Sequence, residues 1–377
     1  MKQKITAVHL YNDYSGSPKV LAGNLAFLAQ EGYDITIHCS DQTGPLSDIA
    51  GTSQQVFAYA PESNKFRQLL RFLNIQLVLF LRLMKQLEPG ELVYINTLLP
   101  FGAAIAARVR GCKVIYHLHE TSVKPAILKG FLKLVAKWTA HRLIYVSQFL
   151  ANEEPIKPAK ASVIPNSLSE EFISKTLELP STEPSAQTFT CLMACSLRKY
   201  KGVDQYVELA RLLPAIQFEL VLNATDQEIS TYFQGTTLPD NLIVFPRQND
   251  MHWFYRRVHM VLNLSLPDQW VETFGLTLLE GMCYGRPVIG PAVGGPVELI
   301  DHRVSGFMTD AYDTMLLAKQ IRQISSNPLI YHSFSHQARR RANHYSSTKT
   351  NEKWINLLSG LRNSSSNVST QLGIEAA

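Results

Sequence analysis

The sequence predicts an α/β protein built from two doubly wound domains that face a cleft. Two observations lead to this prediction. Short apolar or β-branched segments alternate with longer helical ones along most of the 377 residues, which is typical of parallel sheets with crossover helices. A polar, proline-containing stretch at 179–187 interrupts the alternation near the middle of the chain, as a linker between two domains does.

The first half alternates from its start, with each predicted strand followed by a loop and then a helix. The strands expected here are Ile5–Leu10, Ile35–His38, Leu92–Ile95, Lys113–His117 and Arg142–Val146. The helices expected here are Pro18–Gln30, Lys65–Leu87, Phe101–Val109 and Ala126–Thr139. This order predicts one parallel sheet with helices on its faces.

The second half repeats the same alternation. The strands expected here are Thr190–Ala194, Phe218–Leu222, Leu242–Phe245, Met260–Leu262 and Val288–Ile289. The helices expected here are Val203–Leu212, Asp250–Arg256, Leu276–Tyr284 and Tyr312–Ile324. We therefore place one domain at residues 1–178 and another at 188–345. A last helix at 346–362 is expected to pack back on the first domain, and the low-complexity stretch 363–377 is expected to be disordered.

Composition is that of a globular protein with an ample core, since 46% of the residues are hydrophobic and 18% are charged. The five cysteines show no CxxC pair or metal-ligand spacing, which indicates reduced thiols and a cytoplasmic location. Positive charge is concentrated in residues 51–150, which hold 13 Lys or Arg and 4 Asp or Glu. The first domain should therefore present a basic face to some partner.

The segment from Glu272 to Gly290 carries the most specific functional signal. Two carboxylates, Glu272 and Glu280, lie eight residues apart, and Gly275 marks the point where a loop becomes a helix. Backbone N–H groups at such a helix start bind phosphate, and a carboxylate can accept from ribose hydroxyls. A capping box of Thr277 and Glu280 would explain the second carboxylate alone. It would not explain the Gly-Arg-Pro turn and the glycine-rich loop that follow.

Two loops that follow predicted strands are further candidates for phosphate binding. In one, Arg198, Lys199 and Lys201 follow the first strand of the second domain, where cations could meet a charged diphosphate. In the other, Gly16 follows the first strand of the chain and precedes a helix N-terminus. A solvated surface turn would also account for either loop taken alone.

A His-x-His pair, His117 and His119, stands at the end of a predicted strand. Both rings should lie on one face of that strand, as two metal ligands could. No third ligand stands at a usable spacing, so we expect no metal. A strand-end histidine that points into the predicted cleft is the interpretation we favour, and a core or surface histidine is its alternative.

In this order, the motifs resemble those of the retaining glycosyltransferases of family 4 (glycosyl transferases group 1), which have the GT-B fold of two Rossmann-like domains. The resemblance extends from the Gly16 loop past Asp310, and its most specific part is the Glu272–Glu280 motif with its Phe-Gly and Gly-Arg-Pro-Val elements. It implies that residues 1–178 bind a saccharide acceptor and residues 188–345 a nucleotide-diphosphate sugar, linked to UDP or GDP. It further implies transfer with retained anomeric configuration and no cofactor or metal.

The resemblance also implies roles for single residues. Its catalytic residues fall on His119, near the reacting sugar, on Lys201, at the diphosphate that leaves, and on Glu272, at the donor sugar. Glu280 would hold the ribose. The other donor-binding residues that it implies are Gly16, Arg198, Thr273, Phe274, Gly275 and Leu276.

One position departs from the family pattern. The family's phosphate arginine, five residues before the lysine, falls on Ser196. Either Arg198 replaces it, or Lys201 neutralises the diphosphate alone. The departure keeps open a non-catalytic partner subunit with the same fold. A nucleotide-sugar epimerase with the GT-B fold is a separate alternative.

Two basic helical stretches, Lys65–Lys85 and Pro125–Trp138, bear on the acceptor. Neither has the uninterrupted run of about 18 apolar residues that a membrane span needs. They could lie on an anionic membrane surface, or they could be ordinary crossover helices with their cations in solvent. Membrane binding would favour a lipid-linked saccharide acceptor at the inner face of the membrane, in cell-surface polysaccharide or glycoconjugate synthesis. The basic region has no evident aromatic stacking platform, so no nucleic acid is expected.

Overall fold

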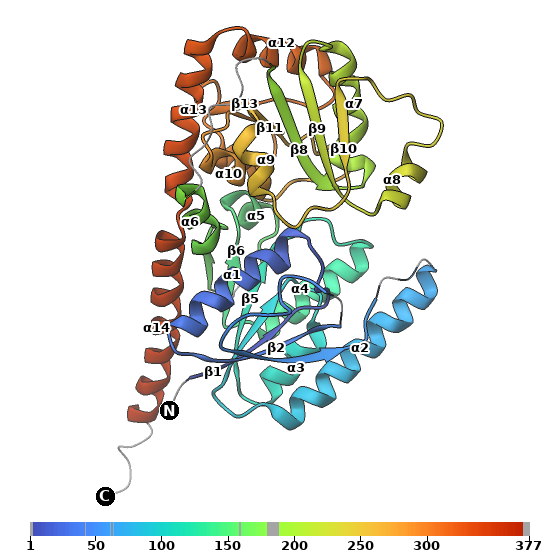
Figure 1. Cartoon of the computed structure of the whole chain (residues 1–377). Coiled ribbons are helices and arrows are strands. Elements are labelled where there is room, and N and C mark those ends of the chain that lie inside the picture. The colour runs from blue at the N-terminus through green and yellow to red at the C-terminus, as the bar shows by residue number, and fades with distance from the viewer. Residues whose placement is uncertain are drawn as a thin grey trace, which may run out of the picture. The chain divides into compact units, whose positions relative to one another are not determined.

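Two compact units make up the chain, each built around one parallel sheet (Figure 1). The computed structural model describes residues 3–41, 43–60, 62, 64–157, 160–178 and 188–371, with side chains as far as residue 361. Unit 1 groups Met1–Val146, Glu154–Pro165 and Ser347–Ala377, and unit 2 groups Ser147–Glu153 and Asn166–Ser346. The two doubly wound sheets confirm the predicted fold class.

The sheet of unit 1 has the order β3-β2-β1-β4-β5-β6-β7 among the described residues, with every neighbouring pair parallel. Its strands are β1 Lys4–Val8, β2 Asp34–Ser40, β3 Thr52–Phe57, β4 Leu92–Asn96, β5 Lys113–Leu118, β6 Arg142–Tyr145 and β7 Ala161–Val163. The order reverses between β1 and β4. In open parallel sheets, ligands bind beyond the carboxyl ends of the strands at such a switch point.

The helices of unit 1 cover both faces of this sheet. They are α1 Gly16–Gln30, α2 Lys65–Gln86, α3 Phe101–Val109, α4 Ala126–Thr139 and α14 Ser347–Gln371. Helices α1 and α14 share one core with alternate strand residues such as Tyr94. Trp354 of α14 is fully buried there, and its ring stacks on that of Tyr94 with 5.2 Å between centroids. Helix α3 packs between α2 and α4 and contacts β4 and β5.

The sheet of unit 2 has the order β10-β9-β8-β11-β12-β13, again parallel throughout. Its strands are β8 Thr190–Ser196, β9 Gln217–Asn223, β10 Leu242–Phe245, β11 Met260–Leu262, β12 Val288–Gly290 and β13 Gly306–Met308. The order reverses between β8 and β11, so the loops that follow these two strands flank the switch point of unit 2.

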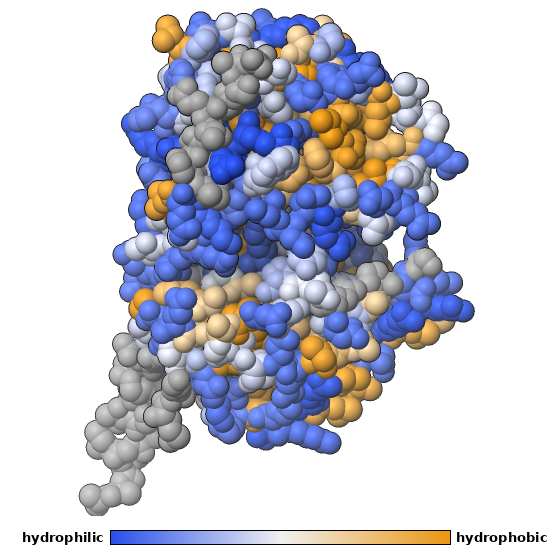
Figure 2. All heavy atoms as spheres, viewed as in Figure 1, coloured by the Kyte–Doolittle hydropathy of each residue, from blue (hydrophilic) through white to orange (hydrophobic). Residues whose placement is uncertain are grey.

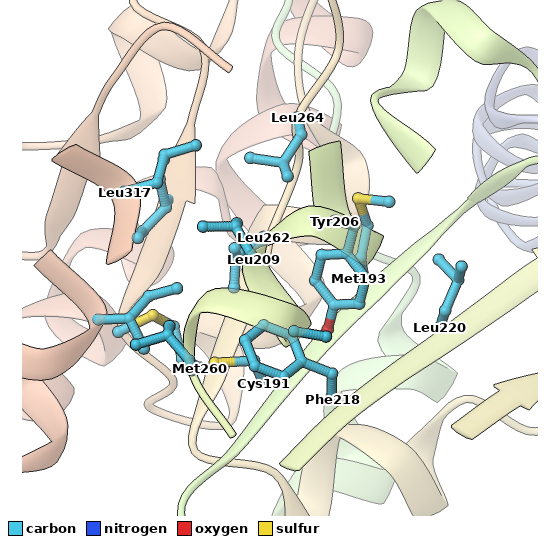
Figure 3. Close-up of a cluster of buried hydrophobic side chains, with 14 of the residues drawn as sticks. Cys191, Met193, Tyr206, Leu209, Phe218, Leu220, Met260, Leu262, Leu264 and Leu317 are labelled. Carbon is cyan, nitrogen blue, oxygen red and sulfur yellow. The ribbon is translucent and has the colours of Figure 1, made fainter. Parts of the chain in front are cut away.

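Helices α7 (Val203–Leu212) and α12 (Thr314–Ser325) pack on one face of this sheet. Figure 3 shows the core between these helices and the sheet, where Tyr206 and Leu209 of α7 lie against Met193 and Phe218 of the sheet. The remaining helices of unit 2 are α5 Gln148–Glu153, α6 Glu170–Glu178, α8 Asp226–Tyr232, α9 His252–Arg257, α10 Leu276–Cys283, α11 Pro296–Leu299 and α13 Pro328–Ala342, with 3₁₀ turns η1 Lys199–Lys201 and η2 Asn343–Tyr345.

Two limits of the expected domains differ from the structure. The chain passes between the units at 147–153 and 166 as well as near 346, because α5 and α6 belong with unit 2; the expected boundary followed the linker 179–187, which lies outside the described residues. Helix α14 runs to Gln371, past residue 362 and into the stretch expected to be disordered. Neither proline nor glycine occurs between residues 361 and 371 to end it.

The described helices include none that combines the length and the apolar character needed to cross a membrane.

Candidate functional site

Three loops of unit 2 meet at the carboxyl ends of β8 and β11. Lys201 closes the 3₁₀ turn after β8, Asn263 directly follows β11, and Glu272 lies in the loop before α10. Lys201 Nζ donates to Glu272 Oε2 at 3.0 Å, and Asn263 Nδ2 donates to the same oxygen at 3.3 Å. Each side chain of the ion pair is only 17% exposed. The structure thus joins two of the predicted catalytic residues directly.

The ion pair keeps both groups charged despite their burial. Burial acts to lower the pKa of Lys201, but the adjacent Glu272 carboxylate outweighs it and the pKa lies above its ordinary value. Burial acts to raise the pKa of Glu272, and the Lys201 charge and hydrogen bond, with donors from Asn263 and the Phe274 N–H, bring it below the ordinary value. A fixed ammonium therefore stands at the switch point, where a phosphate could bind it.

The glycine-rich loop after β12 holds the Glu272 segment in place. The Gly295 N–H donates to the Glu272 carbonyl at 2.8 Å. A Cβ on Gly295 would lie 2.1 Å from the Thr273 carbonyl oxygen, and one on Gly294, whose φ is +97°, would lie 2.2 Å from the Glu272 carbonyl oxygen. Only glycine allows the two loops to approach so closely.

Gly275 begins helix α10 in a left-handed conformation, with φ at 101°. The first bonds within the helix run from the N–H groups of Leu278 and Leu279 to the Gly275 carbonyl. The N–H groups of Leu276 and Thr277 precede these bonds and stand at the positive end of the helix dipole. The helix therefore starts at the predicted glycine, and the Phe274 N–H before it donates to Glu272.

Glu280 lies inside α10 and is only 2% exposed. Its Oε2 accepts from the Tyr255 hydroxyl at 2.6 Å. The capping-box alternative is wrong, because Gly275 is the N-cap, no side chain caps the helix, and Thr277 lies within it. Burial, followed by the Glu280 carboxylate, raises the pKa of Tyr255, so the phenol stays protonated and can donate.

The loop before Glu272 packs on the turn that carries Lys201. The Trp270 ring stacks on that of Tyr200, with 5.3 Å between centroids and 19° between planes. Lys201 Nζ lies 5.5 Å from the centre of the Trp270 ring, within cation–π range. The Leu266 N–H donates to the Tyr200 carbonyl at 2.8 Å. Trp270 thus forms one wall beside the ion pair.

The position of the missing phosphate arginine is held by Ser196, the last residue of β8. The Arg198 side chain is exposed, and its backbone N–H donates to the Ser196 carbonyl. A second guanidinium, that of Arg247, follows β10, and its Nε donates to Asn223 Oδ1 at 2.6 Å. The pKa of Glu228 is lowered mainly by donors of Thr225 and then by the charges of Arg247 and Arg198. Both guanidinium charges therefore act on the Glu228 carboxylate.

Unit 1 brings His119 together with Asn96, the last residue of β4, and with His9, which follows β1. His119 Nε2 and Asn96 Oδ1 are 2.9 Å apart, and Asn96 Nδ2 lies 3.1 Å from His9 Nδ1. The His117 ring packs 4.2 Å from that of His119, which confirms that both rings share a face. Burial, followed by the neighbouring His117 and His9, lowers the pKa of His119 well below its ordinary value. The imidazole is therefore neutral at pH 7.

Glu120 clamps the loop after β5 to the loop after β4. Its carboxylate accepts from the N–H groups of Leu98 at 3.3 Å and His119 at 3.2 Å, and from the Thr97 side chain. Thr97 has a φ of 72°, a strained conformation for a β-branched residue. Burial raises the pKa of Glu120 to about 7, and these donors oppose that shift.

Replacement of Glu120 by glutamine should change how stability depends on pH. The folded pKa lies above the unfolded value of about 4.3, so the folded state binds the extra proton and loses stability as pH rises from about 5 to 7. In Glu120→Gln the loss of unfolding free energy between pH 5 and pH 7 should be smaller by about 2 kcal/mol. Each pKa unit is worth about 1.4 kcal/mol, and partial exposure screens the group. Urea unfolding at both pH values measures this loss, and an unchanged loss would contradict the assignment.

Gly16 begins α1, and an added Cβ there would meet nothing within 4 Å. This position therefore has no steric need for glycine. The part of the chain that the structure describes holds no group of three or more His, Cys, Asp or Glu residues arranged to bind a metal ion.

Several residues at these strand ends were not singled out from the sequence. They are Asn96, Thr97, Arg247, Tyr255 and Asn263. Asn263 directly follows a predicted strand of a doubly wound domain and Arg247 stands two residues after another, so a polar residue at a strand end was the available signal. Tyr255 lies within a predicted helix and carried no such signal.

Comparison with known proteins gives matches over both units. The model of glycosyl transferases group 1 matches residues 175–341, and that of glycosyltransferase family 4 matches residues 15–172. An uncharacterized glycosyltransferase of Haemophilus influenzae is 22% identical over 354 residues, covering 91% of this chain and 96% of its own length.

Two solved structures show the same fold. The structure of HepE from Anabaena in complex with UDP and glucose has a TM-score of 0.75 at 20% identity, covering 95% of this chain and 99% of its own. Sucrose-phosphate synthase of Thermosynechococcus elongatus also has a TM-score of 0.75, at 18% identity, covering 96% and 100%. Both likenesses confirm the predicted two-unit architecture.

Proposed function

Because this chain belongs to glycosyltransferase family 4, the glycosyl transferases group 1 with the GT-B fold, we propose that it transfers a sugar from a UDP-linked donor with retained anomeric configuration. The observation that carries this proposal is the buried Lys201–Glu272 pair at the switch point of unit 2. UDP is favoured over GDP because the structurally similar HepE was solved with UDP and with UDP-glucose.

In this proposal Lys201 contacts the diphosphate and stabilises the charge that develops as it leaves. Its ammonium is held in place by Glu272 and flanked by Trp270, so little reorganisation is needed when the donor binds. The start of α10, at Gly275 and Leu276, supplies backbone N–H groups to the same anion. Arg198, two residues after Ser196, replaces the family's phosphate arginine as a second cation.

The two carboxylates divide the rest of the donor. Glu272 accepts from a hydroxyl of the donor sugar, since a carboxylate with two oxygens can keep Lys201 and take a further donor. Glu280 accepts from ribose hydroxyls, in exchange for or beside the Tyr255 hydroxyl that it binds here. Thr273 and Phe274 lie between the two carboxylates in the chain. Gly294 and Gly295 pack closely against the backbone of this segment and hold it in place.

His119 is the proposed catalytic residue of unit 1. A neutral imidazole that is fixed by Asn96 and by the Glu120 clamp can accept a hydrogen bond from a reacting hydroxyl. We propose that the acceptor is a saccharide, carried on a lipid and used in cell-surface polysaccharide or glycoconjugate synthesis. A cytoplasmic location fits the free cysteines of the described chain.

A nucleotide screen and a donor assay test this function. UDP should raise the melting temperature by roughly 5–10 °C at a concentration about one hundred times its dissociation constant, and GDP should raise it less. Labelled UDP-glucose should be hydrolysed slowly without acceptor. Stabilisation by UDP without any turnover would favour the non-catalytic partner subunit, and conversion to a free epimeric sugar would favour the epimerase. No stabilisation by any nucleoside diphosphate would overturn the proposal.

A further inference from the structure

The outward side of α2 carries a row of exposed apolar side chains. Its inward side is buried in the usual way by Phe72, Ile75, Leu79 and Leu83. The exposed row recurs every three or four residues, so it forms one stripe along the helix. Its members are Phe66, Leu69, Leu70, Leu73, Leu77 and Leu81. A soluble helix normally turns polar residues outward, so this stripe needs a partner.

Helix α4 repeats the arrangement. Ile127, Phe131, Leu134 and Trp138 are exposed at a spacing of four, three and four residues, and Ile127 is 87% exposed. This spacing places all four on one side of the helix. Its opposite side is buried through Leu132, Val135 and Ala136.

The two stripes belong to one layer of unit 1. Helix α3 lies between α2 and α4, and the Phe101 ring at its start meets the rings of both neighbours edge-on. The centroid distances are 5.8 Å to Phe72 and 5.1 Å to Phe131. We call the exposed sides of α2 and α4 together the α2–α4 surface. Figure 2 shows hydrophobic residues among hydrophilic ones in the region where Figure 1 draws α2.

The charge of this surface has one sign. The 22 residues of α2 include five Lys or Arg and no Asp or Glu, and the 14 residues of α4 include three Lys and no Asp or Glu. Two neighbouring carboxylates offset part of it, Glu154 at Lys129 and Lys133, and Glu62 at 3.4 Å from Arg71. Cations at the edges of both stripes remain, including Arg67, Lys85 and Lys137.

We propose that the α2–α4 surface docks on an anionic lipid bilayer, with its apolar stripes among the headgroups and its cations at the lipid phosphates. Amphipathic helices with basic edges bind such surfaces by this combination. A second copy of this chain is a poorer occupant, because two α2–α4 surfaces would bring like charges together. The proposal goes beyond the sugar transfer, since docking needs no donor or acceptor.

Vesicle flotation tests the proposal on the full-length protein. The protein should float with phosphatidylcholine vesicles that contain phosphatidylglycerol, and should remain behind with pure phosphatidylcholine or in high salt. The variant Leu73→Glu/Leu77→Glu changes two residues that are 49% and 56% exposed. It should lower partitioning roughly tenfold, because it removes buried apolar area and adds charge of the wrong sign.

The control is Leu177→Glu/Leu329→Glu, which makes the same change in net charge at two exposed leucines of unit 2, 79% and 81% exposed. It should float like the wild type. An unchanged melting temperature and UDP-glucose hydrolysis in both variants show that folding and the donor site are intact, so failure to float cannot be confused with failure of the proposed function. Any of three results would overturn the proposal. The wild-type protein could fail to float with anionic vesicles, or the two double variants could partition equally. The third is a dimer that Leu73→Glu/Leu77→Glu dissociates, without any vesicle binding.

Discussion

Replacing Lys201 with alanine should lower the turnover of UDP-glucose by about a hundred- to a thousandfold. The ammonium stands at the carboxyl end of β8, fixed by Glu272 at 3.0 Å, where a leaving diphosphate would develop its charge. Loss of one preorganised group at such a position typically has an effect of about this size. The release of UDP from labelled donor, measured at saturating UDP-glucose, gives the change in kcat.

Lys199 provides the matched control, because it lies in the same 3₁₀ turn but is exposed. Lys199→Ala has the same change in net charge and should keep turnover within about twofold of wild type, since exposed charges are screened. Equal losses in the two variants would mean that only the general charge of the turn matters. Turnover that survives in Lys201→Ala would remove this lysine from the proposed mechanism.

Replacing Glu272 with leucine should destabilise the protein by about 3–5 kcal/mol, because it leaves the Lys201 ammonium buried without its partner. The double variant Lys201→Met/Glu272→Leu should recover most of that loss while remaining inactive. Urea unfolding measures the stability, and the donor assay measures turnover. Recovery of stability without activity would separate the catalytic role of the pair from its structural role.

The contribution of the Lys201–Glu272 pair to stability should depend on pH. The pKa of Glu272 is lowered on folding, so its contribution is present above the ordinary carboxylate pKa and is lost as pH falls through the folded value. The pKa of Lys201 is raised, so its contribution is lost only as pH rises through an alkaline value. The difference in unfolding free energy between Glu272→Leu and wild type should therefore be largest near neutral pH and should disappear in acid.

A surface ion pair of unit 2 serves as the control for this comparison. Glu208 and Arg211 are both exposed on α7, with 3.4 Å between charged atoms. Glu208→Leu should change stability by less than about 1 kcal/mol. If Glu272→Leu proved as mild as Glu208→Leu, the Lys201–Glu272 pair would be solvated and could not be the fixed cation that the proposed function requires.

Much of the fold could be predicted because each element carries its own local signal. Helices α3, α4 and α7 run over the predicted residues, and β10 and β11 do so too. Elements with weak local signals were missed. Strand β3 is a polar edge strand with the sequence TSQQVF, and β7 and β13 have three residues each.

Helix α13 was missed although its start is well marked, with Asn327 capping the N–H groups of Leu329 and Ile330. Its basic and polar residues dilute the apolar periodicity that marks a helix in a sequence. Tertiary contacts replace that signal, since Phe334 packs on Phe307 at 5.3 Å between ring centroids. Such contacts depend on strand order, which local patterns do not contain.

The site was predicted as separate motifs, and the pairing between them was not. Lys201 and Glu272 are 71 residues apart, and they meet only because β11 pairs with β8 across the switch point. His119 and Asn96 meet because β4 and β5 are neighbours, with Asn96 in register with His117. The roles of single residues at these strand ends stay predictions until they are measured.

Calorimetric titration of UDP tests the central claim, that the Lys201–Glu272 site of unit 2 binds a nucleotide diphosphate. One UDP should bind per wild-type chain, and Lys199→Ala should bind it equally well. Lys201→Ala should bind it roughly 10- to 100-fold more weakly, because a hydrogen bond to a charged group contributes about 1.5–3 kcal/mol. A wild-type chain that binds no UDP, or a Lys201→Ala variant that binds it unchanged, would contradict the claim.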